Sequence, residues 1–174
     1  MNLKEWPVIV RQHSPLVWQT AYRLLANHAD ASDCFQETFV GAWEMACRQP
    51  VRNWPGFLQH LATARALDQL RRRRRAAKHL AGPTELGGIT SIQSGPLAQA
   101  QSHELAAQLR RALAELPEQQ SQAFCLRHLN GFSYEQIADA LGITVSNVGV
   151  SLHRATERLR VILAPVLASE SDKR

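Results

Sequence analysis

The sequence predicts an all-α protein with two small helical domains joined by a flexible linker. Apolar residues recur at helical spacing through most of the chain, and no segment shows the strict alternation expected of β-strands. Residues 82–102 lose this spacing and concentrate Gly, Pro, Ser and Gln, which is typical of linkers. We therefore expect a first domain over residues 1–80, a linker over 81–102 and a second domain over 103–168.

The first domain is expected to contain three helices. A helix over residues 16–25 follows Pro15, which interrupts the start of the chain. Asp30 can cap the second helix, which should end before Pro50, and the third helix should run over residues 54–74. Each helix carries an apolar stripe, so the three can bury one small core.

The second domain contains the most specific pattern in the sequence, two short helices joined by one tight turn. Ser133 and Gln136 form a capping box that opens the first helix. Gly142 allows a sharp exit from that helix, and Thr144 can cap the next one. We expect the fold to end at Pro165. The spacing predicts a helix-turn-helix.

The second helix of this motif leaves one side free. Small polar residues at its start, followed by arginines one and two turns later, suit base edges and phosphates in the major groove. The alternative interpretation is an ordinary helical hairpin with a solvated charged side. The residues that we expect to contact DNA are Ser146, Asn147, Gly149, Val150, Ser151, His153, Arg154 and Arg158.

The positive charge is concentrated in the first half of the chain. Residues 1–80 hold 12 Lys and Arg against 6 Asp and Glu, whereas residues 81–174 hold 8 against 9. Most of the excess is the run of five arginines from Arg71 to Arg75. Such a run is typical of a protein that binds a polyanion, here most simply DNA.

Several classes of protein are not indicated. The sequence shows no phosphate-binding loop, catalytic motif or metal-ligand spacing, so we expect no enzyme activity, cofactor or metal site. Cys34, Cys47 and Cys125 lie far apart, and we interpret them as buried small hydrophobic residues. The sequence lacks a signal-peptide pattern and a long apolar run, so we expect a cytoplasmic protein.

The order of these parts resembles the small extracytoplasmic-function (ECF) sigma factors of bacterial RNA polymerase. The resemblance lies in DASDCFQETFVGAW and WPGFLQHLATARALDQLRRRRR before the linker, and in LRRALAELPEQQSQAFCLRHLNGFSYEQIADALGI and LHRATERLR after it. It covers about residues 12–163. It implies a domain like sigma region 2, for polymerase binding and promoter melting, followed by a helix-turn-helix domain like sigma region 4.

The resemblance also implies the protein partners. The acidic side of the second helix would dock on the clamp helices of the largest catalytic subunit of the RNA polymerase core through Asp33, Gln36 and Glu37. We favour core packing for Phe39 and Trp43 on the same helix. The flap of the second-largest subunit and an anti-sigma factor are further expected partners.

In the first domain, the loop before the third helix and the helix itself resemble the part of a sigma factor that opens promoter DNA. Opening a duplex needs cations along the backbone and a site for an unstacked base. Trp54 can stack on such a base or pack in the core, and both roles are open. The residues assigned to this surface are Arg48, Arg52, Asn53, Trp54, His60, Arg65, Asp68, Arg71 and Arg72.

In the second domain, the resemblance assigns the last helix to the distal, double-stranded promoter element. Gly149 and Ser151 stand where many family members carry Lys and Arg, so the base preference cannot be transferred. The function implied is a sigma factor that directs core polymerase to promoters and starts transcription. The alternative is a helix-turn-helix regulator that binds duplex DNA without becoming a polymerase subunit.

Overall fold

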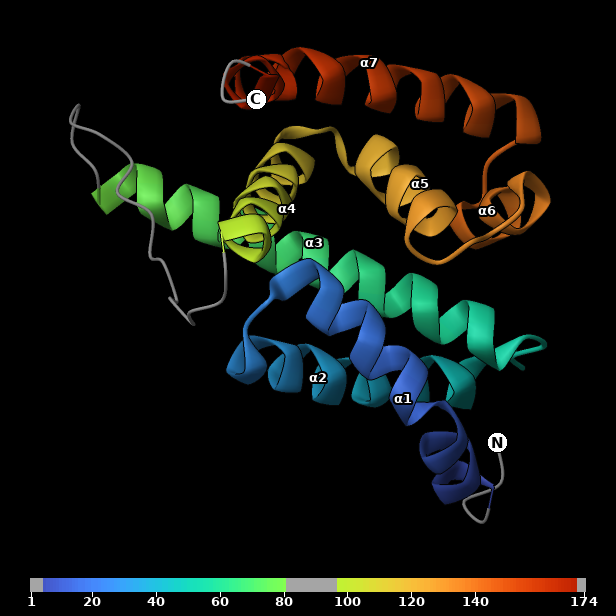
Figure 1. The fold of residues 1–174 in the computed structure, drawn as a ribbon. Helices are drawn as coiled ribbons and strands as arrows, with labels where there is room; N and C mark the ends of the chain where they lie inside the picture. Colours follow the sequence, from blue (N-terminus) through green and yellow to red (C-terminus); the bar gives the residue numbers. More distant parts are fainter. Residues whose placement is uncertain (1–4, 81–96, 172–174) are drawn as a thin grey trace.

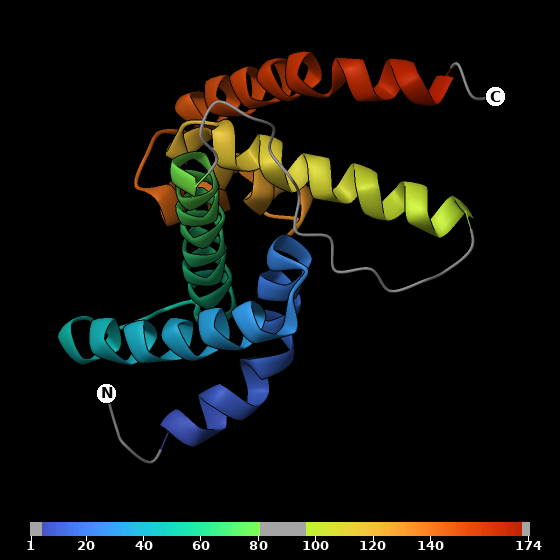
Figure 2. The ribbon, with the colours of Figure 1, turned by 90° about the vertical axis from the view of Figure 1, so that its left-hand side faces the viewer.

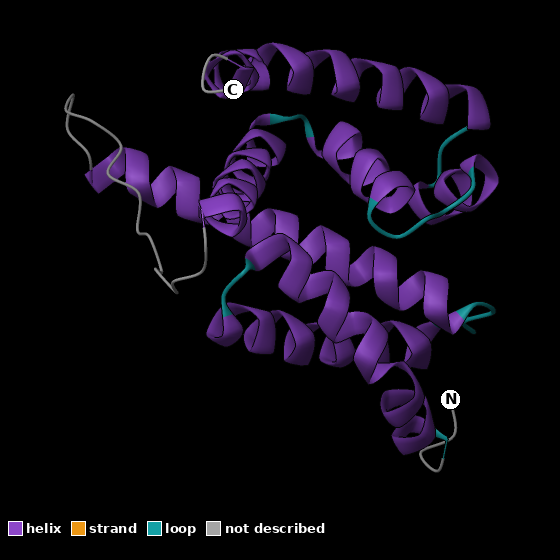
Figure 3. Ribbon diagram, in the orientation of Figure 1, coloured by secondary structure: helices purple, strands orange, loops and turns teal. Residues whose placement is uncertain are grey.

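The computed structural model describes residues 5–80 and 97–171, and every regular element within these ranges is a helix (Figure 3). The predicted all-α class is therefore confirmed. The helices are, in chain order, α1 (Trp6–Leu25), α2 (His28–Arg48), α3 (Trp54–Leu80), α4 (Leu97–Glu115), α5 (Glu118–His128), α6 (Tyr134–Leu141) and α7 (Val145–Ser171).

The long helix α3 lies at the centre of the molecule. It packs against α1 and α2 of the first domain and against α4 and α5 of the second (Figures 1 and 2). On the other side of the second domain, α7 packs along α4, α5 and α6. The two domains are therefore in direct contact through α3.

Two helix starts in the first domain differ from the prediction. Helix α1 begins at Trp6 and contains Pro15, so this proline does not mark the start of the helix. A proline removes one backbone donor from a helix, and the packed remainder of α1 tolerates this loss. Helix α2 is capped by Asn27, whose side chain accepts a hydrogen bond from the backbone N–H of Asp30 at 3.0 Å, so the assignment of Asp30 as the cap is wrong.

Two further boundaries in the second domain need correction. Helix α4 begins at Leu97, so residues 97–102 are helical although the sequence places them in the linker. The remainder of the predicted linker, 81–96, lies outside the described residues. Helix α7 continues through Pro165 to Ser171, so Pro165 does not end the last helix.

The buried residues form three clusters, and the largest of them joins the two domains. It combines Leu24 of α1 and Leu67 of α3 with Leu113 of α4, Cys125 of α5 and Leu159 of α7. A second cluster lies within the helix-turn-helix, and a third holds α1, α2 and α3 together at the end where Trp54 begins α3. The domains are thus distinct in sequence but share a hydrophobic core.

Candidate nucleic-acid interface

The turn between α6 and α7 has the local geometry that its sequence predicts. Both hydrogen bonds of the capping box between Ser133 and Gln136 are present at the start of α6. Gly142 ends α6 with a φ of 63°, a left-handed conformation that costs glycine little. The hydroxyl of Thr144 accepts a hydrogen bond from the backbone N–H of Asn147 at 3.2 Å and caps α7.

The first four turns of α7 expose a polar face. Gly149 is half-buried, and a Cβ at this position would lie 3.8 Å from the ring of Tyr134, an ordinary contact distance. The predicted DNA-binding residues that are exposed on this face are Ser146, Asn147, Val150, His153, Arg154 and Arg158.

Ser151 differs from the other residues predicted for this surface. It is only 6% exposed, and its hydroxyl accepts a hydrogen bond from Nε2 of Gln119 at 3.1 Å. Its placement on the free side of the helix is therefore wrong, because it turns inward toward the start of α5. This hydrogen bond joins α7 to the first turn of α5.

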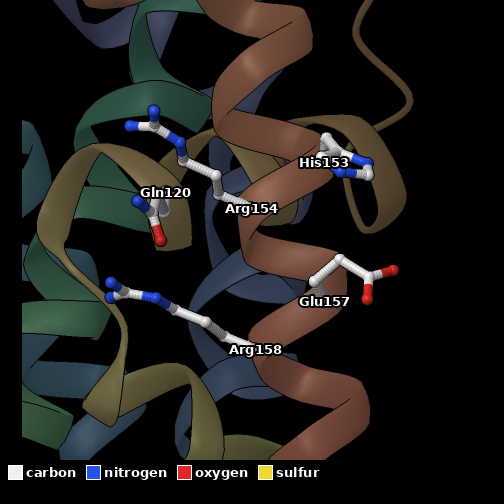
Figure 4. A pocket seen from close by; sticks show the side chains of 5 residues that line it. All are labelled: Gln120, His153, Arg154, Glu157 and Arg158. Carbon is white, nitrogen blue, oxygen red and sulfur yellow. The ribbon is translucent and has the colours of Figure 1, made fainter.

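The structure adds residues from α5 to this surface. Gln120, in the first turn of α5, lines two hollows together with residues of α7, and Gln119 lines one of them. In one hollow, Gln120 lies between the side chains of Arg154 and Arg158, with His153 and Glu157 beside them (Figure 4). Sequence reasoning missed Gln120 because its proximity to α7 depends on tertiary packing. The only signal was the glutamine pair Gln119 and Gln120, which follows Pro117 and Glu118 at the start of a predicted helix.

Helix α2 presents the predicted polymerase-binding residues on its outer face. Asp33, Gln36 and Glu37 are all exposed. Glu37 forms an ion pair with Arg65 of α3 at 3.4 Å, with the two side chains 62% and 31% exposed respectively. The guanidinium of Arg65 lies where a Cβ at Gly41 would be, so the absence of a side chain there lets Arg65 lie across α2.

The aromatic residues of the first domain pack against one another. Trp6 makes edge contacts with Phe39, Trp43 and Trp54, at centroid distances of 6.0, 5.2 and 5.9 Å. Phe39 is buried, whereas Trp43 and Trp54 remain partly accessible. Packing roles are therefore present for all three, and a stacking role for Trp54 stays a prediction because part of its ring is accessible.

The end of α2 and the loop before α3 each keep one cation on the surface. Arg48 and Arg52 are exposed. Asn53 has a local role, because its Oδ1 accepts a hydrogen bond from the backbone N–H of Gly56 at 3.1 Å and so caps α3. Arg48, the last residue of α2, and Arg52 in the loop therefore remain accessible to a ligand.

The residues predicted along α3 are divided between the surface and the domain contact. Arg72 is exposed and pairs with Asp68 at 2.8 Å. His60 is half-buried beside Gln122 of α5, and burial lowers its pKa while a hydrogen bond with Gln122 raises it less. Arg71 donates a hydrogen bond to the hydroxyl of Ser121. His60 and Arg71 are therefore partly covered by the second domain.

The arginine run makes more contacts within the protein than its sequence suggests. Arg73 pairs with Asp30 of α2, and Arg74 pairs with Glu115 of α4 at 3.1 Å. Periodicity places these arginines on different sides of α3, but only the tertiary structure supplies their acidic partners. The arginine run therefore joins α3 to α2 and α4 through ion pairs, in addition to supplying positive charge.

The described ranges contain no group of three or more His, Cys, Asp and Glu residues that could hold a metal ion. A search of the same ranges for a helix both long and apolar enough to cross a membrane found none.

The fold and these surfaces define the class of protein. It is a helical protein in which a helix-turn-helix domain is joined to a three-helix domain with an acidic outer face. Comparison with known families assigns both parts, because Sigma-70 region 2 matches residues 9–76 and Sigma-70 region 4 matches residues 106–159.

Individual relatives support the same assignment. The ECF RNA polymerase sigma factor SigE of Mycolicibacterium smegmatis is 33% identical over 162 residues, which are 93% of this chain and 63% of SigE. SigL of Mycobacterium tuberculosis, also an ECF sigma factor, is 31% identical over 87% of this chain and 85% of its own length. The chain belongs to the ECF sigma factor family.

Solved structures show the same fold. The sigma factor RpoE of Bartonella quintana, in complex with the anti-sigma factor NepR, matches 93% of this chain and 98% of its own with a TM-score of 0.57 and 24% identity. CnrH in complex with the cytosolic domain of CnrY matches 94% of this chain and 90% of its own with a TM-score of 0.58 and 19% identity.

Proposed function

We propose that this chain is the promoter-specificity subunit of a bacterial RNA polymerase and is not itself an enzyme. One observation carries the proposal: a single chain presents an acidic face on α2 and a separate polar and basic face on α7, and both are exposed. A regulator that only bound duplex DNA would need the second face but not the first. The matches to both sigma regions support the sigma factor over that alternative.

The outer face of α2 would bind the clamp helices of the largest polymerase subunit. Asp33 and Glu37 offer carboxylates to basic side chains, and Gln36 offers an amide between them. Val40, which is 59% exposed, would add apolar contact on the same side of the helix. Charge complementarity would set the register of the complex, while apolar burial would add affinity.

The first domain would also stabilise the opened promoter. Arg48, Arg52 and Arg72 are exposed cations that can follow a DNA backbone, and Trp54 offers a partly accessible ring. Each base taken out of the stack costs a few kcal/mol, which stacking and phosphate contacts must replace. The polymerase would carry out the chemistry, and this chain would hold the strands apart.

The second domain would read the distal promoter element in duplex form. Ser146 and Asn147 lie at the start of α7, where a recognition helix reaches base edges. Arg154 and Arg158, with Gln120 of α5 between them, suit the phosphates that border the groove. The first turns of α7 would thus read the bases, and the next two turns would position the helix on the DNA backbone.

An anti-sigma factor is the regulatory partner that we propose for this chain. RpoE and CnrH, which share its fold, were each solved together with another protein, NepR or CnrY. A cytoplasmic location follows from the same proposal, because the chain would act on polymerase and DNA.

Run-off transcription with purified core polymerase on genomic DNA fragments tests this function. Specific transcripts should appear only when the protein is added to core. Specific duplex binding by the free protein, with no transcript and no association with core, would support the helix-turn-helix regulator instead. The same experiment reads out the promoter sequence.

A further inference from the structure

The side chain of Arg65 crosses from α3 onto α2, although the sequence assigns this residue to promoter DNA. Its guanidinium lies against Gly41, where a Cβ would overlap Nη2 and lie 3.2 Å from Cζ. Gly41 itself is buried. Any other residue at position 41 would therefore displace the end of the Arg65 side chain. The missing side chain of Gly41 creates the space that holds this guanidinium.

Arg65 occupies one position in a row of side chains on the outer face of α2. Residues four apart on a helix lie one turn from each other on the same face, so Asp33, Glu37 and Gly41 form one row. The first two carry exposed carboxylates. At the third position, the guanidinium of Arg65 stands where a side chain of α2 would otherwise be. The predicted polymerase-binding face thus contains a cation that another helix supplies.

The arginine is held more firmly than the carboxylate with which it pairs. Nε of Arg65 is buried, and among the described residues it has no hydrogen-bond partner. The side chain of Arg65 is 31% exposed, whereas that of Glu37 is 62% exposed. Nη1 of Arg65 lies 3.4 Å from Oε2 of Glu37. The fixed guanidinium therefore restricts a long side chain that would otherwise move freely.

This restriction affects binding because ordering a side chain opposes association. A glutamate that is free in solution loses rotamer freedom when a partner's cation binds it. Arg65 orders Glu37 in advance through Oε2, and the exposed carboxylate can still offer Oε1 to a partner. An exposed ion pair contributes little to the stability of a fold. Its larger effect is therefore expected on the affinity of the outer face of α2.

We propose that Arg65 is a positioning residue of the polymerase-binding face. Held against Gly41, it keeps the carboxylate of Glu37 in the orientation that meets a basic side chain of the clamp helices, and it does not contact promoter DNA. This role rests on the proposed function, in which the outer face of α2 binds core polymerase. It adds Arg65 and Gly41 to the residues that determine that binding.

Gly41→Ala tests this role without removing a charge. Alanine is favoured over glycine inside a helix, so the melting temperature should not fall. The displaced guanidinium should lower the affinity for purified core polymerase about threefold to tenfold, and Arg65→Ala should lower it by a similar factor. In a Glu37→Ala background neither substitution should lower the affinity further, because both act through Glu37. Parental core affinity in either single variant, or losses that add to that of Glu37→Ala, would overturn the proposal.

A second measurement separates this role from binding to DNA. With core polymerase at saturating concentration, Arg65→Ala should bind a promoter fragment found by run-off transcription as tightly as the parent does. Arg72→Ala removes an exposed cation of the same helix, so it should weaken this binding and make it less dependent on salt. Loss of promoter affinity in Arg65→Ala with parental core affinity would overturn the proposal alone. Failure of the parent to bind core would overturn the proposed function, and the role of Arg65 with it.

Discussion

The three cysteines show how burial sets the chemistry of single residues. Burial raises the pKa of Cys34 to about 11 and that of Cys125 to about 12. For Cys125, the charge of Arg71 opposes this rise only in part. Because the thiolate is the reactive form, both thiols are held inert in the folded protein. Cys47 is exposed, so its interpretation as a buried residue is wrong.

Thiol titration should separate these residues. In the native protein at pH 8, an aromatic disulfide reagent should modify Cys47 quickly and leave Cys34 and Cys125 unmodified. Denaturation should release all three thiols of the chain. In Cys47→Ser the fast phase should disappear. A second fast thiol in the native parent would mean that one of the buried sites opens within the assay time.

Arg154 and Gln120 allow the recognition surface to be tested at single positions. Arg154→Ala should weaken promoter binding by the polymerase complex by about 1–3 kcal/mol if the side chain reads a base, and by less if it touches only phosphate. Gln120→Ala should also lower this affinity, because the Gln120 side chain borders the same hollow as Arg154. Footprinting titrations measure both effects. Arg160→Ala, whose side chain pairs with Glu157 at 2.8 Å, should behave like the parent.

At the scale of elements, α2 should bind the polymerase through its outer face. This face is not part of the hydrophobic core of the protein. Asp33→Lys should reduce affinity for core polymerase while leaving the melting temperature nearly unchanged, because this side chain is exposed. Glu104→Lys makes the same change of charge at an exposed position of α4 and is the control. Equal core affinity for the two variants in a pull-down titration would contradict this assignment. Glu37→Lys is a less specific test because it also breaks the pair with Arg65.

His60 of helix α3 should make the stability of the folded protein depend on pH. Burial lowers the pKa of this histidine in the folded state, so the unfolded chain binds a proton first as the pH falls below about 6.5. Its contribution to stability should therefore be complete at neutral pH and be lost on acidification. When the pH is lowered from about 7.5 to 5.5, the melting temperature of the parent should fall more than that of His60→Gln. Equal losses in the two proteins would contradict the effect.

At the scale of the whole molecule, the shared core should make the two domains unfold together. Leu113 is 1% exposed and belongs to the cluster that also contains Leu67 of α3. Calorimetry should therefore show one cooperative transition. Leu113→Ala should lower the free energy of unfolding by about 3 kcal/mol through lost burial and the cavity left behind. Val161→Ala, at a position 74% exposed, should change it by less than about 0.5 kcal/mol. Two separate transitions in the parent would contradict a common core.

Local signals in the sequence were accurate where one short segment determines the geometry. The capping box at Ser133, the left-handed Gly142 and the Thr144 cap each depend on residues within a few positions of one another. Pro15 and Pro165 misled the prediction for the opposite reason. A proline removes only one helical hydrogen bond, and a helix packed along its length can retain its course through that position.

The sequence by itself determined the all-α class, the helix-turn-helix and the acidic face of α2, because periodicity and capping are properties of neighbouring residues. It could not determine which partners the arginine run would meet, that Gln120 would lie beside α7, or that Ser151 would turn inward. The tertiary structure alone decided that Asn130 joins Thr20 and Thr63 across the domains. These contacts join residues far apart in the chain, and their formation depends on how the helices pack around α3.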